Sequence, residues 1–304
     1  MSVGSRPGAA AAPAPGLAPR DALLLGLVLV GWALNFVVAK LALQELPPLL
    51  LTALRFTVVA AVLLPFAPRP QKLGRVAIIA LTLGVLHFST MFTALASGAP
   101  VASIAVTAQL NVPFSAVLAA FFLNDRLGPW RIVGMVIGLA GVAIMSFDPA
   151  VAAHVAALAL AVLAAFFWAV GNVQSKAFGF TDAVALNAWM GVFVAPAMLL
   201  LSFLFEPAPL HALAEAGWRG WGGVVYMGVV VTAFGYGVWF ALVRRYSVNV
   251  VTPASLLVPP MAAILAWMLL SEPLTPRLVL GGLVTLAGVA VVVIRRPQWG
   301  ERSA

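Results

Sequence analysis

The segment at residues 250–293 decides the fold, because the chain carries the same pattern a second time. It reads VVTPASLLVPPMAAILAWMLLSEPLTPRLVLGGLVTLAGVAVVV, and a shift of 147 positions places it without a gap on residues 103–146, SIAVTAQLNVPFSAVLAAFFLNDRLGPWRIVGMVIGLAGVAIMS. Under this shift Pro113 faces Pro260, Gly134 faces Gly281, and the run Ala-Gly-Val-Ala occurs in both copies. Identities at one fixed spacing along the whole segment indicate an internal repeat.

Each copy predicts an apolar helix, a short polar turn with an acid and a proline, and a Gly-rich apolar helix. A proline inside a membrane helix removes a backbone donor and bends the helix. Pro113 in the first copy and Pro259 and Pro260 in the second therefore predict matching bends. Interrupted helices at corresponding positions of two repeats are typical of the centre of a membrane transporter.

The composition is that of an integral membrane protein. Hydrophobic residues make up 63% of the chain, charged residues only 9%, and the mean hydropathy is +1.08, whereas soluble domains are about half apolar and a quarter charged. There is no cysteine, so a disulfide framework and a thiolate metal site are excluded. The net charge of +8 is spread between apolar runs, which favours membrane topology over nucleic-acid binding.

Ten apolar segments approach the length of about 20 residues that a membrane span needs. Their predicted bounds are 21–43, 49–66, 75–96, 101–123, 129–147, 154–176, 183–205, 221–243, 249–271 and 277–294. The loops between them are short and leave no room for an extramembrane domain. Residues 1–20, rich in Ala, Pro and Gly, predict a disordered cytoplasmic tail, and residues 295–304 a second cytoplasmic tail.

The positive charges predict the orientation. With the N-terminus inside, the segments outside the bilayer on the outer face hold only Lys40, Arg219 and Arg277. The inner face then holds thirteen basic residues, namely Arg6, Arg20, Arg69, Lys72, Arg75, Arg126, Arg131, Lys176, Arg244, Arg245, Arg295, Arg296 and Arg302. The positive-inside rule therefore predicts that both termini lie in the cytoplasm.

The ten spans divide into two sets of five, at residues 21–147 and 154–294. The repeat extends to the first span of each set, since Trp32 and Lys40 have the same spacing as Trp168 and Lys176. Because five is odd, the two halves must cross the membrane in opposite directions. The predicted fold is all-α, with ten transmembrane helices as two inverted five-helix repeats, and a substrate site is expected between the halves.

The chain resembles the EamA-type drug/metabolite transporter family, and within it the bacterial exporters of O-acetylserine and cysteine. The resemblance extends over about residues 22–295. It is carried by Gly31-Trp-Ala-Leu-Asn-Phe-Val-Val-Ala-Lys40, Pro47-Pro48, Leu54-Arg-Phe56, Asn124-Asp-Arg-Leu127, Phe167-Trp-Ala-Val-Gly-Asn172, Gly235-Tyr-Gly-Val-Trp239, Leu256-Leu-Val-Pro259 and Ser271-Glu-Pro-Leu-Thr275. It implies a ten-helix inverted-repeat fold and efflux of small metabolites, typically amino acids or their derivatives. In the middle section, Thr107-Ala-Gln-Leu-Asn111 departs from the subgroup pattern, which would have a second glutamine and aromatic residues.

No predicted span interior holds an Asp or a Glu, and His87 is the one group inside a span that could change charge to couple transport to protons. A Gly-x-x-x-x-Gly-Lys loop is also missing, so this chain alone does not use ATP. Facilitated efflux and proton exchange through His87 both remain open. No cofactor, metal site or enzymatic activity is predicted, because a membrane-embedded lipid enzyme would need clustered catalytic groups at one depth, and a non-transporting scaffold would need no matched bends.

Several polar and aromatic residues at depth are candidates for a substrate cavity. His87, with Met91 one turn later, either bonds to a backbone carbonyl or faces the cavity. Arg55, about 9 Å deep at 1.5 Å per residue, either snorkels outward, pairs with backbone carbonyls or attracts a substrate carboxylate. Lys40 and Lys176 are expected to be interfacial anchors. Asp125 and Glu272 are expected to cap the helices that follow them, and a gating role is the alternative for both acids.

The other candidates are aromatic and amide groups that share helix faces. An aromatic wall suits an ammonium group through cation–π contacts, and amides supply hydrogen bonds. These candidates are Trp32, Asn35, Gln109, Trp168, Asn172, Tyr236, Trp239 and Ser255. The expected partners are a small-molecule substrate and the lipid bilayer, and the Gly-rich fifth and tenth spans pack closely within a monomer or across a homodimer.

Overall fold

The computed structural model describes residues 17–123, 129–246 and 251–294, and these residues form helices without any strand. The first half contains α1 (Pro19–Ala42), α2 (Pro48–Leu63), η1 (Leu64–Phe66), α3 (Leu73–Ile79), η2 (Ala80–Leu86), α4 (His87–Ala96), α5 (Val101–Ala108), α6 (Asn111–Phe122) and α7 (Pro129–Ser146). The short α8 (Pro149–Ala152) leads into the second half. This half contains α9 (Val155–Ala177), α10 (Ala183–Phe205), α11 (Pro209–Glu215), α12 (Trp218–Val225), η3 (Tyr226–Tyr236), α13 (Gly237–Tyr246), η4 (Thr252–Leu257), α15 (Val258–Leu270) and α16 (Pro276–Ile294).

In the described part of the chain, nine helices are long and apolar enough to cross a membrane, and a shorter apolar segment, Ile132–Ser146, lies within α7. The prediction of an all-α membrane fold with repeated halves is confirmed, although only nine of the ten predicted spans meet the full length. The start of the first span differs from the prediction. The first span begins at Pro19, because proline is favoured in the first turn of a helix. Residues 1–16, which hold most of the predicted tail, and 295–304, the predicted second tail, lie outside the described residues, as does Asp125.

Helices α7 and α16 pack against each other through glycines whose contacts are related by a twofold axis. A Cβ added at Gly134 would lie 2.6 Å from the carbonyl oxygen of Gly288, and one added at Gly281 would lie 2.7 Å from that of Gly141. The shift of 147 positions relates Gly134 to Gly281 and Gly141 to Gly288. Reciprocal contacts of this kind are what a twofold axis requires. Gly134 meets Gly288 and Gly141 meets Gly281, so α7 and α16 lie side by side and antiparallel. Because the two helices are equivalent in the repeat, the two halves are inverted relative to each other.

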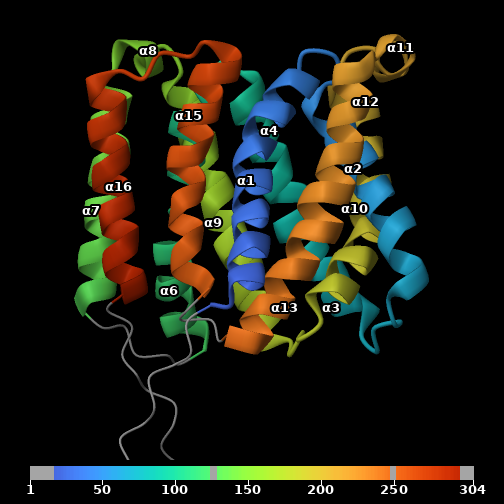
Figure 1. Cartoon of the computed structure of the whole chain (residues 1–304). Helices are drawn as coiled ribbons and strands as arrows, with labels where there is room; N and C mark the ends of the chain where they lie inside the picture. The colour runs from blue at the N-terminus through green and yellow to red at the C-terminus, as the bar shows by residue number, and fades with distance from the viewer. Residues whose placement is uncertain (1–16, 124–128, 247–250, 295–304) are drawn as a thin grey trace, which may run out of the picture.

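The first helix of each half packs mainly against helices of the other half. Helix α1 packs against α15, η3 and α12 of the second half, and α9 packs against α4, α5 and α6 of the first half. Figure 1 shows α1 between α15 and α12, with the α7–α16 pair at one end of the bundle and the α2–α10 pair at the other. The same view shows α1 beginning and α16 ending on one side of the bundle. The exchange of first helices places the centre of the bundle between the two halves.

The helices at this centre are irregular at matching positions. The fourth span is interrupted between α5 and α6, at Gln109 and Leu110, and the ninth span changes from the 3-10 turn η4 to α15 after Leu257. Pro113, Pro259 and Pro260 lie in the first turn of the segment that follows each interruption. The third and eighth spans each contain a π-helical segment, η2 and η3. The wider π turn is rare and is frequent at functional sites.

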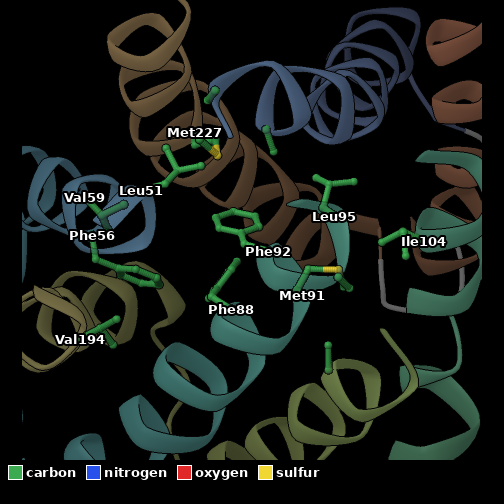
Figure 2. Packing of buried hydrophobic residues seen from close by; sticks show 14 of the residues in the cluster. Leu51, Phe56, Val59, Phe88, Met91, Phe92, Leu95, Ile104, Val194 and Met227 are labelled. Carbon is green, nitrogen blue, oxygen red and sulfur yellow. The ribbon is translucent and has the colours of Figure 1, made fainter. Parts of the chain in front are cut away.

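The largest apolar cluster contains residues from helices of both halves around this centre. Figure 2 shows Phe56 and Val59 of α2 facing Val194 of α10, and Phe88, Met91, Phe92 and Leu95 of α4 directed toward the middle of the bundle. Because Phe88, Met91, Phe92 and Leu95 recur every three or four residues along α4, they form one face of the helix. This packed face fixes α4 against its neighbours and supplies one wall of the cavity described next.

Candidate functional site

A cavity of about 410 Å³ lies between the two halves, within the range of about 300–1,000 Å³ that small-molecule sites occupy. Its walls come from α1, α2, α4, the α5–α6 break, α9, η3, α13 and the η4–α15 junction. All eleven cavity candidates from the sequence line it, namely Trp32, Asn35, Arg55, His87, Met91, Gln109, Trp168, Asn172, Tyr236, Trp239 and Ser255. The structure thus brings together residues from both repeats; their binding of substrate stays a prediction.

One wall is a cluster of aromatic rings from α1 and the eighth span. The ring centroid of Trp32 lies 5.0 Å from that of Trp239 and 5.5 Å from that of Tyr236. The indole Nε1 of Trp32 donates to the carbonyl oxygen of Val231 at 3.3 Å, inside the π-helical segment. A Cβ added at Gly235 would lie only 2.7 Å from this Nε1, so the glycine makes room for the ring. The cluster gives the cavity a rigid, electron-rich face.

His87 bonds to a backbone carbonyl and also lines the cavity, and its binding of substrate or of a proton stays a prediction. Its side chain is buried and lines the cavity, and its Nδ1 lies 2.9 Å from the carbonyl oxygen of Ala164 on α9. Because a carbonyl only accepts, Nδ1 carries the hydrogen, and Nε2 of the neutral ring is an acceptor. The ring also packs edge-on against Trp168 at 4.8 Å. His87 therefore joins the third span to the sixth across the two halves.

Arg55 is a buried cation in the cavity wall. Its residue is only 3% exposed, so it does not snorkel to the interface, and its Nη2 donates to Oγ1 of Thr232 at 3.2 Å. The guanidinium carbon lies 4.5 Å from the centroid of the Phe88 ring, close enough for a cation–π contact. Among the described residues no carboxylate pairs with it. Its charge is thus held in the cavity wall by a hydroxyl and an aromatic face.

The interruption of the fourth span exposes polar groups to the cavity. Gln109 and Asn111 flank the break, and both line the cavity. The side-chain Nδ2 of Asn111 donates to the carbonyl oxygen of Ala108 at 2.6 Å, and so satisfies an acceptor near the end of α5. Ser255 occupies the corresponding region of the ninth span, in η4. The sequence placed these residues near bends, and the bends place them at the cavity.

A second cavity of about 340 Å³ continues from the first toward the side on which α1 begins. The two share six lining residues: Arg55, Phe88, Trp168, Asn172, Tyr236 and Phe240. The second is also lined by Lys176, Phe180 and Thr181, which lie at the end of α9 and in the connection to α10. Arg75, near the start of the third span, donates to the carbonyl oxygen of Phe178 at 3.4 Å and marks the same end of the bundle.

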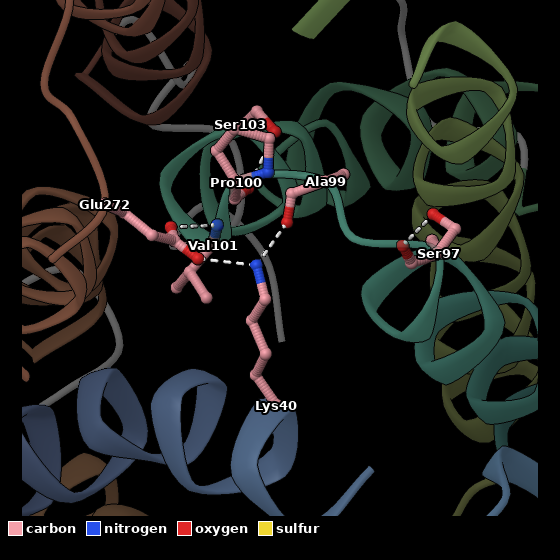
Figure 3. Close-up of polar contacts among 8 residues, drawn as sticks. Lys40, Ser97, Ala99, Pro100, Val101, Ser103 and Glu272 are labelled. Carbon is pink, nitrogen blue, oxygen red and sulfur yellow. Dashed lines mark hydrogen bonds and ion pairs between the residues drawn. The ribbon is translucent and has the colours of Figure 1, made fainter. Parts of the chain in front are cut away.

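On the opposite side, polar contacts tie the two halves together. The ammonium of Lys40 lies 2.5 Å from Oε1 of Glu272 and donates to the carbonyl oxygen of Ala99 at 2.8 Å. Oε2 of Glu272 accepts from the backbone N–H of Val101 at 2.7 Å. Figure 3 shows the carboxylate of Glu272 between Lys40 and the start of α5. We call these four residues, Lys40, Ala99, Val101 and Glu272, the outer latch, because the orientation predicted from the basic residues would place them at the outer face.

The outer latch corrects two expectations from the sequence. Lys40 was predicted to anchor at the interface, but it is an ion-pair partner. Glu272 was predicted to cap the helix that follows it, but it accepts from the start of α5 in the other half. The physical reason is the same in both cases, because the N-terminus of α5 offers free N–H groups to an acid and the acid attracts the lysine. These contacts join residues that are far apart in sequence.

Sequence reasoning missed the apolar part of the lining. Phe36, Phe88, Phe92, Leu95 and Phe240 also face the cavity. Apolar side chains in an apolar span carry no signal of their own, because lipid-facing, core and cavity positions look alike. Their spacing from Trp32, His87 and Trp239 on the same helix faces could have indicated them.

Comparisons with known proteins agree with this architecture. The family model of the EamA-like transporter family matches residues 21–147 and again residues 155–294. The chain belongs to the EamA-like transporter family. It is 32% identical over 283 residues to a probable amino-acid metabolite efflux pump of Escherichia coli (strain K12), covering 90% of this chain and 95% of that protein. The corresponding protein of Salmonella typhimurium (strain LT2), of the same description, has the same identity and coverage.

A solved crystal structure has the same fold as this EamA-like transporter, with a TM-score of 0.60 and 23% identity over 90% of this chain and 96% of that one. The family assignment predicted from the sequence is confirmed. As a member, the chain is a multi-pass inner-membrane transporter for a small-molecule substrate.

Proposed function

We propose that this EamA-like transporter exports amino acids or their derivatives, of the cysteine and O-acetylserine type, from the cytoplasm by alternating access. One observation supports the proposal: the cavity lies between two inverted halves and continues to one side of the bundle, while the outer latch joins the two halves at the other side. This is the arrangement of a carrier that exposes its site to one side at a time.

The direction of export follows from orientation and relatives. The positive-inside rule puts both termini in the cytoplasm, and the second cavity, near Lys176, then faces the cytoplasm. Two relatives with 32% identity are described as probable amino-acid metabolite efflux pumps. A reporter enzyme that is active only in the periplasm, fused to the C-terminus, should stay inactive; an active fusion would reverse the orientation.

The lining suits an amino acid. Arg55 supplies a positive charge, the rings of Trp32 and Trp239 suit an ammonium group, and the amides of Asn35, Gln109 and Asn172 provide further hydrogen bonds. Since one chain supplies both halves of the cavity, and the glycine faces of α7 and α16 are covered within that chain, a monomer suffices for transport. The lining contains no cluster of catalytic type, and we propose transport without an enzymatic step.

A broader specificity for drugs or other metabolites is the alternative, and the aromatic content of the wall favours it. Phe88, Phe92 and Phe240 add apolar surface that a cysteine-sized substrate does not need. The two functions differ in the size of compound that the cavity accepts.

The test is an export assay with the purified chain in liposomes. The panel contains the common amino acids, O-acetyl-L-serine and a set of apolar drugs, and each compound is tested with and without a pH gradient. We expect export of one or more amino acids or O-acetyl-L-serine. Export of the drugs alone would favour the broader alternative, and a stimulation by the gradient would support proton exchange.

A further inference from the structure

Four buried side-chain atoms in the described part of the chain lack a hydrogen-bond partner, and three of them belong to the cavity wall. They are Nε and Nη1 of Arg55 and Oδ1 of Asn35; the fourth is Oγ of Ser115. Leaving a buried donor or acceptor unpaired is costly, so such groups are rare in native structures. The cavity wall thus contains two unpaired donors and one unpaired acceptor. A bound partner with an acceptor and a donor would satisfy them.

The donors belong to a side chain that is already oriented. Arg55 is 3% exposed, Thr232 holds its Nη2, and the Phe88 ring supports the guanidinium face at 4.5 Å. These contacts leave Nε and Nη1 of the guanidinium without a hydrogen-bond partner. The two N–H groups lie on different edges of the planar fork, and each of them can donate a charge-assisted hydrogen bond to a carboxylate oxygen. Arginine keeps its charge, so an anion beside these groups also neutralises a buried cation.

The acceptor lies on α1 beside the aromatic cluster. Asn35 is three residues from Trp32 and so shares its helix face, and both line the cavity with Tyr236 and Trp239. A carbonyl oxygen beside π-faces suits an ammonium group, which donates to the oxygen and is attracted by the rings. The wall formed by Met91, Phe92 and Leu95 carries no charge and suits an uncharged side chain.

We propose that Arg55 and Asn35 recognise the two charged ends of one free amino acid, with the carboxylate accepting from an unpaired N–H group of Arg55 and the ammonium donating to Oδ1 of Asn35. The inference rests on the proposed function and deepens it. It means that the transporter selects the zwitterion and rejects derivatives in which either end is blocked. A site built to hydrogen-bond a group strongly rejects an analogue that lacks it, because its own polar atoms are then left unpaired.

The test uses the full chain in liposomes and three probes with one side chain. L-Methionine has both charges, L-methioninamide lacks the carboxylate, and N-acetyl-L-methionine lacks the ammonium. We expect the parent protein to transport L-methionine at least about tenfold faster than either derivative. Equal transport of the free and the blocked compounds would overturn the proposal.

Two variants test which residue binds the carboxylate and which binds the ammonium group. In Arg55→Gln the preference for L-methionine over its amide should fall to about one, while the preference over N-acetyl-L-methionine remains; Asn35→Leu should show the reverse. Arg55→Lys, which keeps the charge without the fork, should retain part of the preference and serves if Arg55→Gln does not fold. A variant that transports L-methionine with unchanged preferences would overturn the assignment of its residue. If the parent transports none of the amino acids in the panel, the proposed function itself fails.

Discussion

Trp168 lies where the two cavities meet, and it is the residue whose removal should affect transport most selectively. It lines both cavities and packs on His87. We expect Trp168→Ala to lower export at least about tenfold, because an aromatic anchor in a binding site contributes about 2 kcal/mol or more. Gln109→Ala should also lower export, by a smaller factor, since it removes one amide.

The control for this prediction is Trp267→Ala. Trp267 lies on α15, is 57% exposed and does not line the cavity. Export by this variant should match the parent, normalised to the amount of protein in the membrane. If Trp168→Ala and Gln109→Ala both export at the parental rate, the cavity is not the transport site.

His87 should be replaceable by a residue that keeps its hydrogen bond. Asparagine places an N–H near the position of Nδ1 and can still donate to Ala164, whereas alanine cannot. His87→Ala should lower the Tm of the solubilised protein by about 2–4 °C, as expected for the loss of about 1 kcal/mol, and His87→Asn should lower it less. Equal losses in the two variants would argue against a structural role for the Ala164 bond.

His87→Asn also tests whether export is coupled to protons. Export by this variant and by the parent is measured with and without a pH gradient. A stimulation of the parent that disappears in this variant would assign the coupling proton to His87, and one that persists would exclude it.

At the residue scale, the sequence predicted polar and aromatic cavity residues well, because such side chains are expensive inside a membrane and need a reason to be there. Asn35 and Gln109 could be chosen on this ground alone. The unpaired N–H groups of Arg55 could not be foreseen, since they depend on Thr232 and Phe88, which lie on other spans. Phe36 and Phe240 gave no signal because lipid-facing phenylalanines look the same.

The outer latch should control access from the outer side. Removing one partner of a partly buried ion pair costs about 1–3 kcal/mol, which shifts an equilibrium between two conformations roughly 5- to 150-fold. Glu272→Gln should therefore favour the conformation that is open to the outside. The chain has no cysteine, so a single Leu95→Cys in the cavity wall reports access directly.

The measurement is the labelling rate of Leu95→Cys by a membrane-impermeant maleimide added from outside. We expect slow labelling with Glu272 intact and labelling at least about fivefold faster with Glu272→Gln. The matched control is Glu215→Gln, which removes an exposed acid from the outer surface. Labelling at the control rate would show that the latch does not hold the outer side closed.

The contact between α7 and α16 depends on single glycines. A Cβ at Gly281 would lie 2.7 Å from the carbonyl oxygen of Gly141 and 2.5 Å from Cγ of Met145, whereas a Cβ at Gly282 would meet only Cγ2 of Val106, at 3.5 Å. Gly281→Ala should therefore destabilise the protein by about 1–3 kcal/mol, and Gly282→Ala should be tolerated. Thermal unfolding of the two solubilised variants compares adjacent positions; equal stability would contradict the close packing.

At the element scale, the position of the breaks followed from the repeat, since Pro113 and Pro260 are related by the shift of 147. The π-helical segments η2 and η3 were not predicted, because a widened turn is selected by packing against neighbouring helices and has no periodicity that distinguishes it in a short apolar run. The outer latch was missed for a related reason. Lys40 and Glu272 lie 232 residues apart, on different halves.

At the scale of the whole molecule, an odd number of spans in each half is enough to invert the second half, so the topology followed from counting. The exchange of α1 and α9 between the halves could not be predicted, because the sequence of an apolar helix does not indicate which helices it packs against. This exchange gives each half a helix embedded in the other. Trp32 on α1 and Trp168 on α9 both line the cavity. A rocking motion of the two halves would therefore move these two cavity residues.

The central claim is that one cavity, exposed alternately to the two sides, carries an amino acid across the membrane. Counterflow tests it most directly: liposomes containing the protein are loaded with unlabelled L-methionine and diluted into a trace of labelled L-methionine. A carrier with alternating access should accumulate the label transiently above its external concentration, and Trp168→Ala should abolish the overshoot while Trp267→Ala retains it. Entry of the label without an overshoot in the parent, or an overshoot that survives Trp168→Ala unchanged, would contradict the account.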